Sequence, residues 1–189
     1  LVNKNNKFVK IIQMEKLKRK FSNINSNKNF WAAVIMAGGE GKRLRPITEN
    51  QPKPLLKIGG IPLIERQVKD LVKSGIKNIF ISTNYLGHMI EDHFKDGKNF
   101  GANIFYLKEK HKLGTIGSLS LLNKKPEGSM VILNGDILTK SDYTNLFLYH
   151  HQNKNLITIS AVKYKFRIPF GVIKQDNYKV LSIEEKPEE

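Results

Sequence analysis

Short apolar runs alternate with amphipathic stretches along most of the chain. Ala32–Met36 is a continuous, partly β-branched run, which is typical of a strand buried on both faces of a parallel sheet. Leu63–Ser74 shows the helical spacing of apolar positions, with Pro62 before it and Gly75 after it. Similar patterns predict helices at Leu86–Lys95, Gly114–Leu122 and Tyr143–Gln152, and strands at Asn78–Thr83, Ala102–Leu107, Met130–Leu133, Leu156–Tyr164, Phe170–Lys174 and Lys179–Ile183. This alternation predicts an α/β fold with a Rossmann-like, doubly wound, mostly parallel sheet and helices on both faces.

A glycine-rich turn follows the first predicted strand. Gly38, Gly39 and Gly41 can adopt positive φ and carry no Cβ, so backbone N–H groups can approach an anion closely. Arg43 then offers a planar fork of donors to phosphate oxygens, and Lys53 offers a mobile point charge. Because ligands of doubly wound sheets bind at the carboxyl ends of the strands, this segment predicts a triphosphate site.

Two other phosphate-binding loops are excluded by spacing. A P-loop needs a serine or threonine after its lysine, and Arg43 follows Lys42 here. A dinucleotide fingerprint that began at Gly39 and Gly41 would need a third glycine where Leu44 stands. The glycine turn therefore belongs to another class.

The segment GGEGKRLRPIT at Gly38–Thr48, followed by QPKPL at Gln51–Leu55, resembles the signature of the sugar-1-phosphate nucleotidyltransferases. The resemblance implies that Arg43 and Lys53 are catalytic and that the three glycines bind a nucleoside triphosphate. It implies a reaction in which a sugar phosphate oxygen attacks the α-phosphorus and pyrophosphate leaves. Catalysis would then consist of positioning and charge neutralisation.

An Asn-Gly-Asp turn follows the predicted strand Met130–Leu133, which places Asp136 at the carboxyl end of that strand. Mg²⁺ bound to phosphates needs such an oxygen ligand and takes only one or two carboxylates from protein. An ordinary surface turn is the alternative. The family pattern has its metal aspartate here, so the resemblance implies that Asp136 holds Mg²⁺ as the cofactor.

Two further segments match the nucleotide side of the family pattern. Leu113–Gly117 resembles the family's Leu-Gly-Thr-Ala-Gly stretch, which implies nucleotide binding by Gly114 and Thr115. An ordinary helix entry with Thr115 as the N-cap is compatible with the same residues. Asn84 follows another predicted strand and is a candidate for contact with the base.

The sugar phosphate side of the pattern lies near the end of the sequence. Glu184–Pro187 matches a family motif, which implies that Lys186 binds the phosphate of the sugar phosphate and that Glu185 contacts sugar hydroxyls. A solvated charge run is the alternative. Gly171 matches a glycine that lets the sugar pass close to the backbone, although a strand glycine also marks bulges.

Composition and charge bear on the partners and the cellular location of the protein. The net charge is +15, but the basic residues are spread over the chain without interleaved aromatics, which argues against nucleic acid as a partner. No stretch is long and apolar enough to cross a membrane. The chain has no cysteine, which suits a reducing compartment, so a cytoplasmic location is expected and a homo-oligomer stays open.

The two ends of the sequence suggest a piece of a longer protein. The chain begins with Leu1, and residues 1–29 are interpreted either as the end of a CBS regulatory domain plus linker or as a disordered basic leader. Residues 30–189 are expected to be the N-terminal part of the nucleotidyltransferase domain. The family's second metal aspartate is absent from the chain, so full activity is not expected of this stretch alone.

The choice among donor nucleotides rests on resemblance alone. Pro-Lys-Pro-Leu, Asn84-Tyr85 and Leu-Gly-Thr-Ile-Gly are more similar to the mannose-1-phosphate and amino-sugar guanylyltransferases than to other branches, which favours GTP. Thymidylyl, uridylyl and cytidylyl transfer stay open. From another functional class, a regulatory subunit that binds nucleotide or sugar phosphate without turnover is the alternative, and intact Arg43, Lys53 and Asp136 argue against it.

Overall fold

The structure is a computed structural model that describes residues 30–162 and 164–188. The described residues form two compact units, of which the first ends at Leu156 and the second begins at Ile157. The interpretations of residues 1–29 lie outside the described residues.

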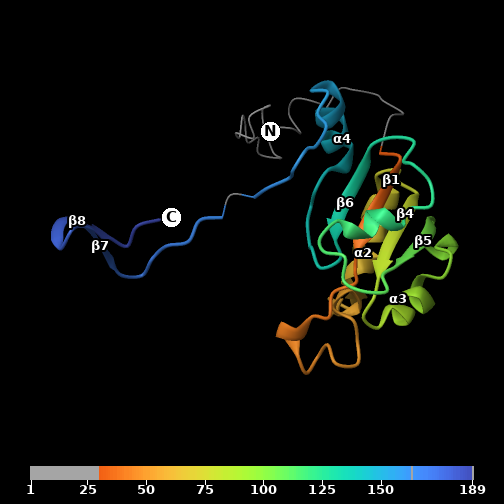
Figure 1. The fold of residues 1–189 in the computed structure, drawn as a ribbon, viewed down its shortest axis with the longest axis horizontal. Coiled ribbons are helices and arrows are strands. Elements are labelled where there is room, and N and C mark those ends of the chain that lie inside the picture. The colour runs from red at the N-terminus through yellow and green to blue at the C-terminus, as the bar shows by residue number, and fades with distance from the viewer. Residues whose placement is uncertain (1–29, 163, 189) are drawn as a thin grey trace. The chain divides into compact units, whose positions relative to one another are not determined.

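A four-stranded parallel sheet forms the centre of the first unit (Figure 1). Its order is β5-β4-β1-β6, and each neighbouring pair is parallel. The central position of β1 agrees with its sequence, because its apolar residues are buried on both faces of the sheet. The strands are β1 (Ala32–Met36), β4 (Asn78–Thr83), β5 (Asn103–Lys108) and β6 (Met130–Asn134).

Strand order and handedness place the connections on both faces of the sheet. The chain moves outward from β1 through α2 (Leu63–Lys73) to β4, and through α3 (Gly87–Phe94) to β5. It then returns to β6 on the other side of β1. Right-handed crossovers put α2 and α3 on one face and the returning connection, with the 3₁₀ helix η4 (Gly117–Leu121), on the other. The predicted parallel α/β fold is confirmed.

The reversal of direction between β1 and β6 is a topological switch point. In open α/β sheets, ligands bind in the crevice outside the carboxyl ends of the strands at such a point. The glycine turn leaves the end of β1, and the Asn-Gly-Asp turn leaves the end of β6. The fold therefore brings the two predicted phosphate and metal segments to one crevice.

The face of the sheet that carries α2 and α3 is the more tightly packed one. Ile79 and Ile104 are paired in register and buried there, and the Tyr106 hydroxyl on the same face donates to the Lys95 carbonyl oxygen at 2.7 Å after α3. On the opposite face Phe80 stacks on Phe105, whose side chain is 49% exposed. The core thus sits mainly between the sheet and these two helices.

Helix ends follow local sequence closely. α2 ends where Gly75 takes a left-handed conformation and donates to the Val72 carbonyl oxygen at 2.9 Å. Just before the start of α2, the strands β2 (Lys57–Ile58) and β3 (Ile61–Pro62) form a small hairpin. Gly59 and Gly60 form its turn, both at positive φ. α4 (Tyr143–Gln152) has the predicted bounds and is capped by the Asp142 side chain, which accepts from the Asn145 backbone N–H at 3.0 Å.

Two of the predicted elements need correction. The helix expected at Gly114–Leu122 is a shorter 3₁₀ helix, and its N-cap is Ile116, not Thr115. Gly114 has a φ of 83°, which excludes it from a right-handed helix. The strand expected at Leu156–Tyr164 is wrong, since residues 156–162 form no strand. Leu156 and Val162 are 98% and 91% exposed, so this apolar pattern finds no sheet face on which to bury itself.

The second unit contains an antiparallel pair, β7 (Gly171–Asp176) and β8 (Lys179–Glu185). Asn177 and Tyr178 form its turn, both at positive φ. Both strands extend two residues beyond the predicted carboxyl ends. Over the described part of the chain, none of the helices has the length and apolar character that crossing a bilayer requires.

Candidate active site

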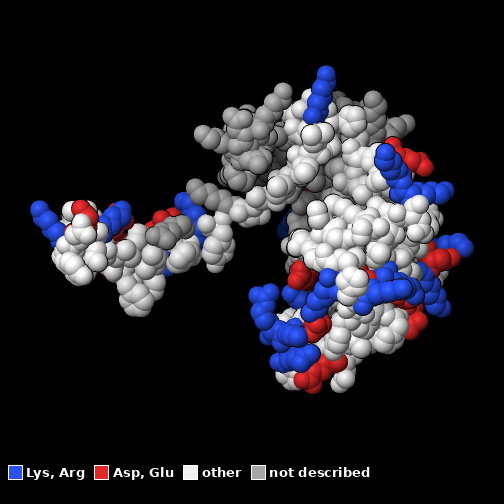
Figure 2. All heavy atoms as spheres, in the orientation of Figure 1, with Lys and Arg blue, Asp and Glu red and all other residues white. Residues whose placement is uncertain are grey.

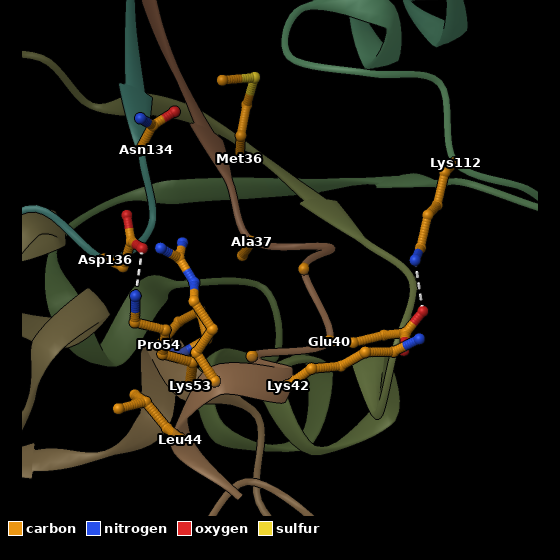
Figure 3. A pocket seen from close by; sticks show the side chains of 13 residues that line it. Met36, Ala37, Glu40, Lys42, Leu44, Lys53, Pro54, Lys112, Asn134 and Asp136 are labelled. Atoms are coloured by element: carbon orange, nitrogen blue, oxygen red, sulfur yellow. Dashed lines mark hydrogen bonds and ion pairs between the residues drawn. The ribbon is translucent and has the colours of Figure 1, made fainter.

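A cavity of about 420 Å³ lies at the carboxyl ends of β1 and β6, as the switch point predicts. Figure 3 shows its side chains converging from the glycine turn, from η2 (Lys53–Leu55) and from the turn after β6. Lys112 reaches it from the loop after β5. The cavity is lined by Met36, Ala37, Gly39, Glu40, Gly41, Lys42, Arg43, Leu44, Lys53, Pro54, Lys112, Asn134 and Asp136.

The three glycines of the turn serve different local needs. A Cβ on Gly38 would lie 3.2 Å from the Asn84 Cβ, so Gly38 allows the turn to pass close to the end of β4. A Cβ on Gly39 would meet nothing within 4 Å, and Gly39 faces the cavity. Of the three, Gly41 alone has a positive φ, at 64°. A Cβ on Gly41 would also lie 3.1 Å from the Thr48 Cγ2, so the turn is shaped by one left-handed residue and by close approaches at Gly38 and Gly41.

Arg43 lies on the short 3₁₀ helix η1 (Lys42–Leu44) directly after the turn. Thr48 fixes this segment, because its buried hydroxyl donates to the Gly41 carbonyl oxygen at 2.9 Å. The guanidinium of Arg43 is exposed at the cavity, and among the described residues no carboxylate is paired with it. Its donors are thus available to an anion.

Lys53 and Asp136 meet at the cavity although they are far apart in sequence. The Lys53 Nζ donates to the Asp136 Oδ2 at 2.5 Å, from η2 to the turn after β6 (Figure 3). Pro52 and Pro54 on either side of Lys53 are buried, which restricts the backbone of η2. The structure therefore joins the predicted catalytic lysine and the predicted metal aspartate.

A second ion-pair cluster at the cavity is absent from the sequence predictions. Glu40 binds the Lys112 ammonium through Oε1, and its Oε2 lies 3.1 Å from the Lys42 Nζ. The hydrogen bonds from Lys112 and Lys42 hold the pKa of Glu40 below its ordinary value. The cluster connects the glycine turn to the loop after β5, a pairing that spacing along the sequence does not reveal.

Glu109 is another residue that the sequence patterns did not single out. Its carboxylate accepts from the Ser82 hydroxyl of β4 and, at 3.2 Å, from the Leu113 backbone N–H. The Asn84 side chain donates to the Glu109 carbonyl oxygen at 2.7 Å. Asn84 and the start of the Leu113–Gly117 loop are thus held at one place beside Gly38, whereas Gly114 and Thr115 do not line the cavity.

The predicted sugar phosphate residues lie together at the open end of the β7–β8 pair. Gly171 is paired with Glu185, and a Cβ on Gly171 would lie 3.2 Å from the Glu185 Oε2. Lys186 follows β8 with a φ of 46°, and its backbone N–H donates to the Phe170 carbonyl oxygen at 3.2 Å. Its ammonium lies 3.9 Å from Glu185 and is exposed. The three residues form one cluster within the second unit.

The residues at the cavity suit a metal ion whose ligands are mostly phosphate oxygens of the substrate. No group of three or more histidine, cysteine, aspartate or glutamate side chains that could hold a metal occurs among the described residues. Asp136 supplies one carboxylate at the cavity, and Asn134 also lines it. Mg²⁺ in nucleotide enzymes keeps substrate phosphates and water as its other ligands, so this donor set fits it.

Charges of both signs lie on the face of the molecule that Figure 2 draws. Figure 2 shows Lys and Arg interspersed with Asp and Glu around the loops at the carboxyl ends of the strands. At the cavity, the ion pairs Lys53–Asp136, Lys42–Glu40 and Lys112–Glu40 likewise combine both signs of charge. A mixed surface of this kind favours local anion binding at the cavity over a broad polyanion track.

Two curated proteins are similar to this chain in sequence. A mannose-1-phosphate guanylyltransferase of Mycobacterium tuberculosis is 32% identical over 159 residues, which cover 83% of this chain and 44% of that protein. A mannose-1-phosphate guanyltransferase of Yarrowia lipolytica is 36% identical over 162 residues, which cover 82% of this chain and 45% of that protein. The chain thus spans under half the length of these curated relatives.

The structure of HddC from Yersinia pseudotuberculosis, complexed with GMP-PN, has a TM-score of 0.60 and 28% identity. The similarity covers 83% of this chain and 70% of that one. Residues 32–189 match the sequence model of the family described as "Nucleotidyl transferase". The match includes the glycine turn, η2, the Asn-Gly-Asp turn and the β7–β8 pair. The chain belongs to the nucleotidyl transferase family.

Proposed function

We propose that this protein transfers a nucleotidyl group from a nucleoside triphosphate to a sugar 1-phosphate and releases pyrophosphate. The observation that carries the proposal is the convergence of Arg43, Lys53 and Asp136 on one cavity beside the glycine turn. Family membership and relatives that are named mannose-1-phosphate guanylyltransferases support it. GTP is the donor that we favour, because those relatives and the GMP-PN complex of HddC concern guanine nucleotides.

The reaction needs no proton transfer or covalent intermediate on the protein. A sugar phosphate oxygen forms a bond to the α-phosphorus while the bond from that phosphorus to the pyrophosphate oxygen breaks. Arg43 binds the phosphates on which negative charge develops. Lys53 binds the α-phosphate and holds the two reacting groups together. Electrostatic stabilisation and positioning therefore account for the roles of these cations.

The Lys53–Asp136 ion pair gives the site a defined state before substrate binds. A phosphate that binds Lys53 competes with Asp136 for the ammonium, and the carboxylate is then available to the cation that accompanies the phosphates. Mg²⁺ held by Asp136 would neutralise phosphate charge. Exchange of partners avoids leaving either charge unpaired in the cavity.

The sugar phosphate is assigned to Gly171, Glu185 and Lys186 as part of the proposal, and the nucleotide to the glycine turn with Asn84, Gly114 and Thr115. A cytoplasmic location is also proposed, consistent with a chain that contains no cysteine.

A ligand panel on the full-length protein tests the function. Thermal unfolding is measured with GTP, UTP, dTTP and CTP, each with and without Mg²⁺, and pyrophosphate release is then measured with mannose 1-phosphate and other sugar 1-phosphates. We expect Mg²⁺-dependent stabilisation by GTP and pyrophosphate release with at least one sugar phosphate. Nucleotide binding without release for any sugar phosphate would support the non-catalytic alternative, and no binding would contradict the proposal.

A further inference from the structure

Gln67 is a polar residue buried beneath the active site. It lies on α2, is 4% exposed and does not line the cavity. Its Nε2 donates to the Asn134 carbonyl oxygen at 2.9 Å and to the Ile137 carbonyl oxygen at 2.7 Å. These two carbonyl groups stand immediately on either side of the Gly135-Asp136 dipeptide. One side chain thus holds both ends of the turn that carries Asp136.

The amide of Gln67 is committed to this turn. Its Oε1 is buried and has no hydrogen-bond partner among the described residues. The two donated bonds therefore fix the orientation of the amide. A buried acceptor without a partner is costly, so the position of the amide is set by the two bonds that it donates and not by its Oε1.

A second attachment holds the same turn from β1. The Gly135 backbone N–H donates to the Met36 carbonyl oxygen at 2.8 Å, and a Cβ on Gly135 would lie 2.9 Å from that oxygen. The turn is therefore clamped between the end of β1 and α2. Of these two attachments, the one through Gln67 depends on a side chain.

The helix that carries Gln67 also supports Lys53. α2 packs against η2, and the Leu63 backbone N–H at the start of α2 donates to the Leu56 carbonyl oxygen at 3.1 Å, just after η2. One helix thus sets the position of both partners of the Lys53–Asp136 ion pair.

We propose that Gln67 is a positioning residue of the active site, which holds the Asn134–Ile137 turn so that the Asp136 carboxylate meets Lys53 and the phosphate-bound Mg²⁺. The inference rests on the proposed function, in which Asp136 is a metal ligand. Gln67 itself touches neither substrate nor metal. Removal of the Gln67 amide loosens the turn and reduces the gain in nucleotide affinity that Mg²⁺ provides. The contacts of the glycine turn with the nucleotide stay unchanged.

Calorimetry of GTP binding with and without Mg²⁺ separates this role from a general loss of stability. In the full-length protein, Gln67→Met keeps the side-chain volume close and removes both donated bonds. We expect the gain in GTP affinity on adding Mg²⁺ to fall at least fivefold, with affinity in the absence of Mg²⁺ within twofold of wild type. Gln67→Asn, which keeps the amide but is too short to reach both carbonyl groups, replaces the methionine variant if that variant does not fold.

Val68→Ala is the matched control. Val68 is the next residue on α2 and is fully buried, and its apolar side chain cannot hydrogen-bond to the turn, so its truncation lowers stability but leaves both bonds donated by Gln67 in place. We expect its Mg²⁺ response to equal that of wild type. A Gln67 variant that matches wild type, or a Val68→Ala variant with the same loss as Gln67→Met, overturns the inference. Wild-type protein that binds no nucleoside triphosphate, or binds it without any Mg²⁺ dependence, instead contradicts the proposed function.

Discussion

The basic side chains at the cavity differ in whether a carboxylate already neutralises their charge. Lys53 is held by Asp136, and Lys42 and Lys112 are held by Glu40. Among the described residues at the cavity, Arg43 is the basic side chain without a carboxylate partner. An incoming phosphate therefore meets the Arg43 guanidinium without first displacing an ion pair, which suits a group that stabilises developing charge.

Replacing Arg43 tests that role directly. A preorganised donor of this kind contributes about 3 kcal/mol in the transition state, so Arg43→Ala should lower turnover by roughly a hundredfold in the full-length protein. Steady-state kinetics of pyrophosphate release measures it. Arg45→Ala is the control, because Arg45 is exposed and close in sequence but does not line the cavity. Normal turnover in Arg43→Ala would exclude a catalytic role.

Glu40 places a negative charge where a triphosphate is expected. Its carboxylate lines the cavity and binds two ammonium groups that could otherwise bind phosphate. Removing the carboxylate frees both ammonium groups for phosphate, so Glu40→Gln should tighten GTP binding by up to roughly fivefold, and more at low salt than at high salt. Calorimetry at two ionic strengths measures the change. Weaker binding in Glu40→Gln would mean that the pair is needed to position Lys112.

Elements were predictable from sequence where the signal is local. The bounds of β1, β4 and α4 agree with the apolar pattern, and Gly75 marks the end of α2. The start of η4 was missed because the pattern does not reveal that Gly114 adopts a positive φ. The strand expected at Leu156–Tyr164 failed because an apolar run becomes a strand only where another strand accepts its hydrogen bonds.

The same limit applies to the site. Motifs identified Arg43, Lys53 and Asp136 individually, and strand order explains why they meet. Glu109 and Gln67 act through contacts with residues far away in sequence, from β4 to the loop after β5 and from α2 to the turn after β6. No local spacing encodes such contacts, so they became visible only in three dimensions.

A contact between α2 and α3 gives a prediction about pH. The Glu65 carboxylate accepts from Lys69 one turn away and lies 3.0 Å from the His93 Nε2 on α3. Burial alone would raise the pKa of Glu65, but the hydrogen bonds from Lys69 and His93 lower it below the ordinary value of 4.5. A carboxyl with a lowered pKa stabilises the fold above its unfolded-state value, and this contribution is lost as the pH falls below it.

Glu65→Gln should therefore reduce the free energy of unfolding by roughly 1 kcal/mol at pH 7, and the difference from wild type should shrink as the pH falls below about 4.5. Urea unfolding at pH 7 and near pH 3.5 measures both values. Glu127→Gln, at an exposed site with no ion pair among the described residues, is the control. A difference that stays constant with pH would assign the effect to packing.

At the scale of the whole molecule, the predicted roles separate by unit. The residues assigned to nucleotide and metal lie between Gly38 and Asp136, in the unit that ends at Leu156. The residues assigned to sugar phosphate lie between Gly171 and Lys186, in the unit that begins at Ile157. Each substrate can therefore be tested through variants of one unit, with the other substrate as an internal reference.

Lys186 is the sharpest test of this division. Its left-handed backbone and the hydrogen bond to Phe170 hold it at the end of β8, and its ammonium is only loosely paired with Glu185 at 3.9 Å. If the side chain were part of a solvated charge run, its loss would cost at most about 1 kcal/mol and would favour neither substrate. If it binds the sugar phosphate, Lys186→Ala should raise the KM for that substrate at least tenfold, because a charge-assisted hydrogen bond to phosphate is lost.

The KM for the nucleotide in the same variant should stay within about twofold of wild type, since no nucleotide contact is removed. Lys179→Ala, an exposed lysine at the other end of the same strand, should change neither KM and controls for the loss of charge. Both values come from steady-state kinetics of the full-length protein with each substrate varied in turn. Equal effects of Lys186→Ala on the two KM values, or no effect on either, would exclude Lys186 from the sugar phosphate site. The division of substrates between the two units would then lose its main support, because Lys186 is the one basic residue among the three assigned to the sugar phosphate.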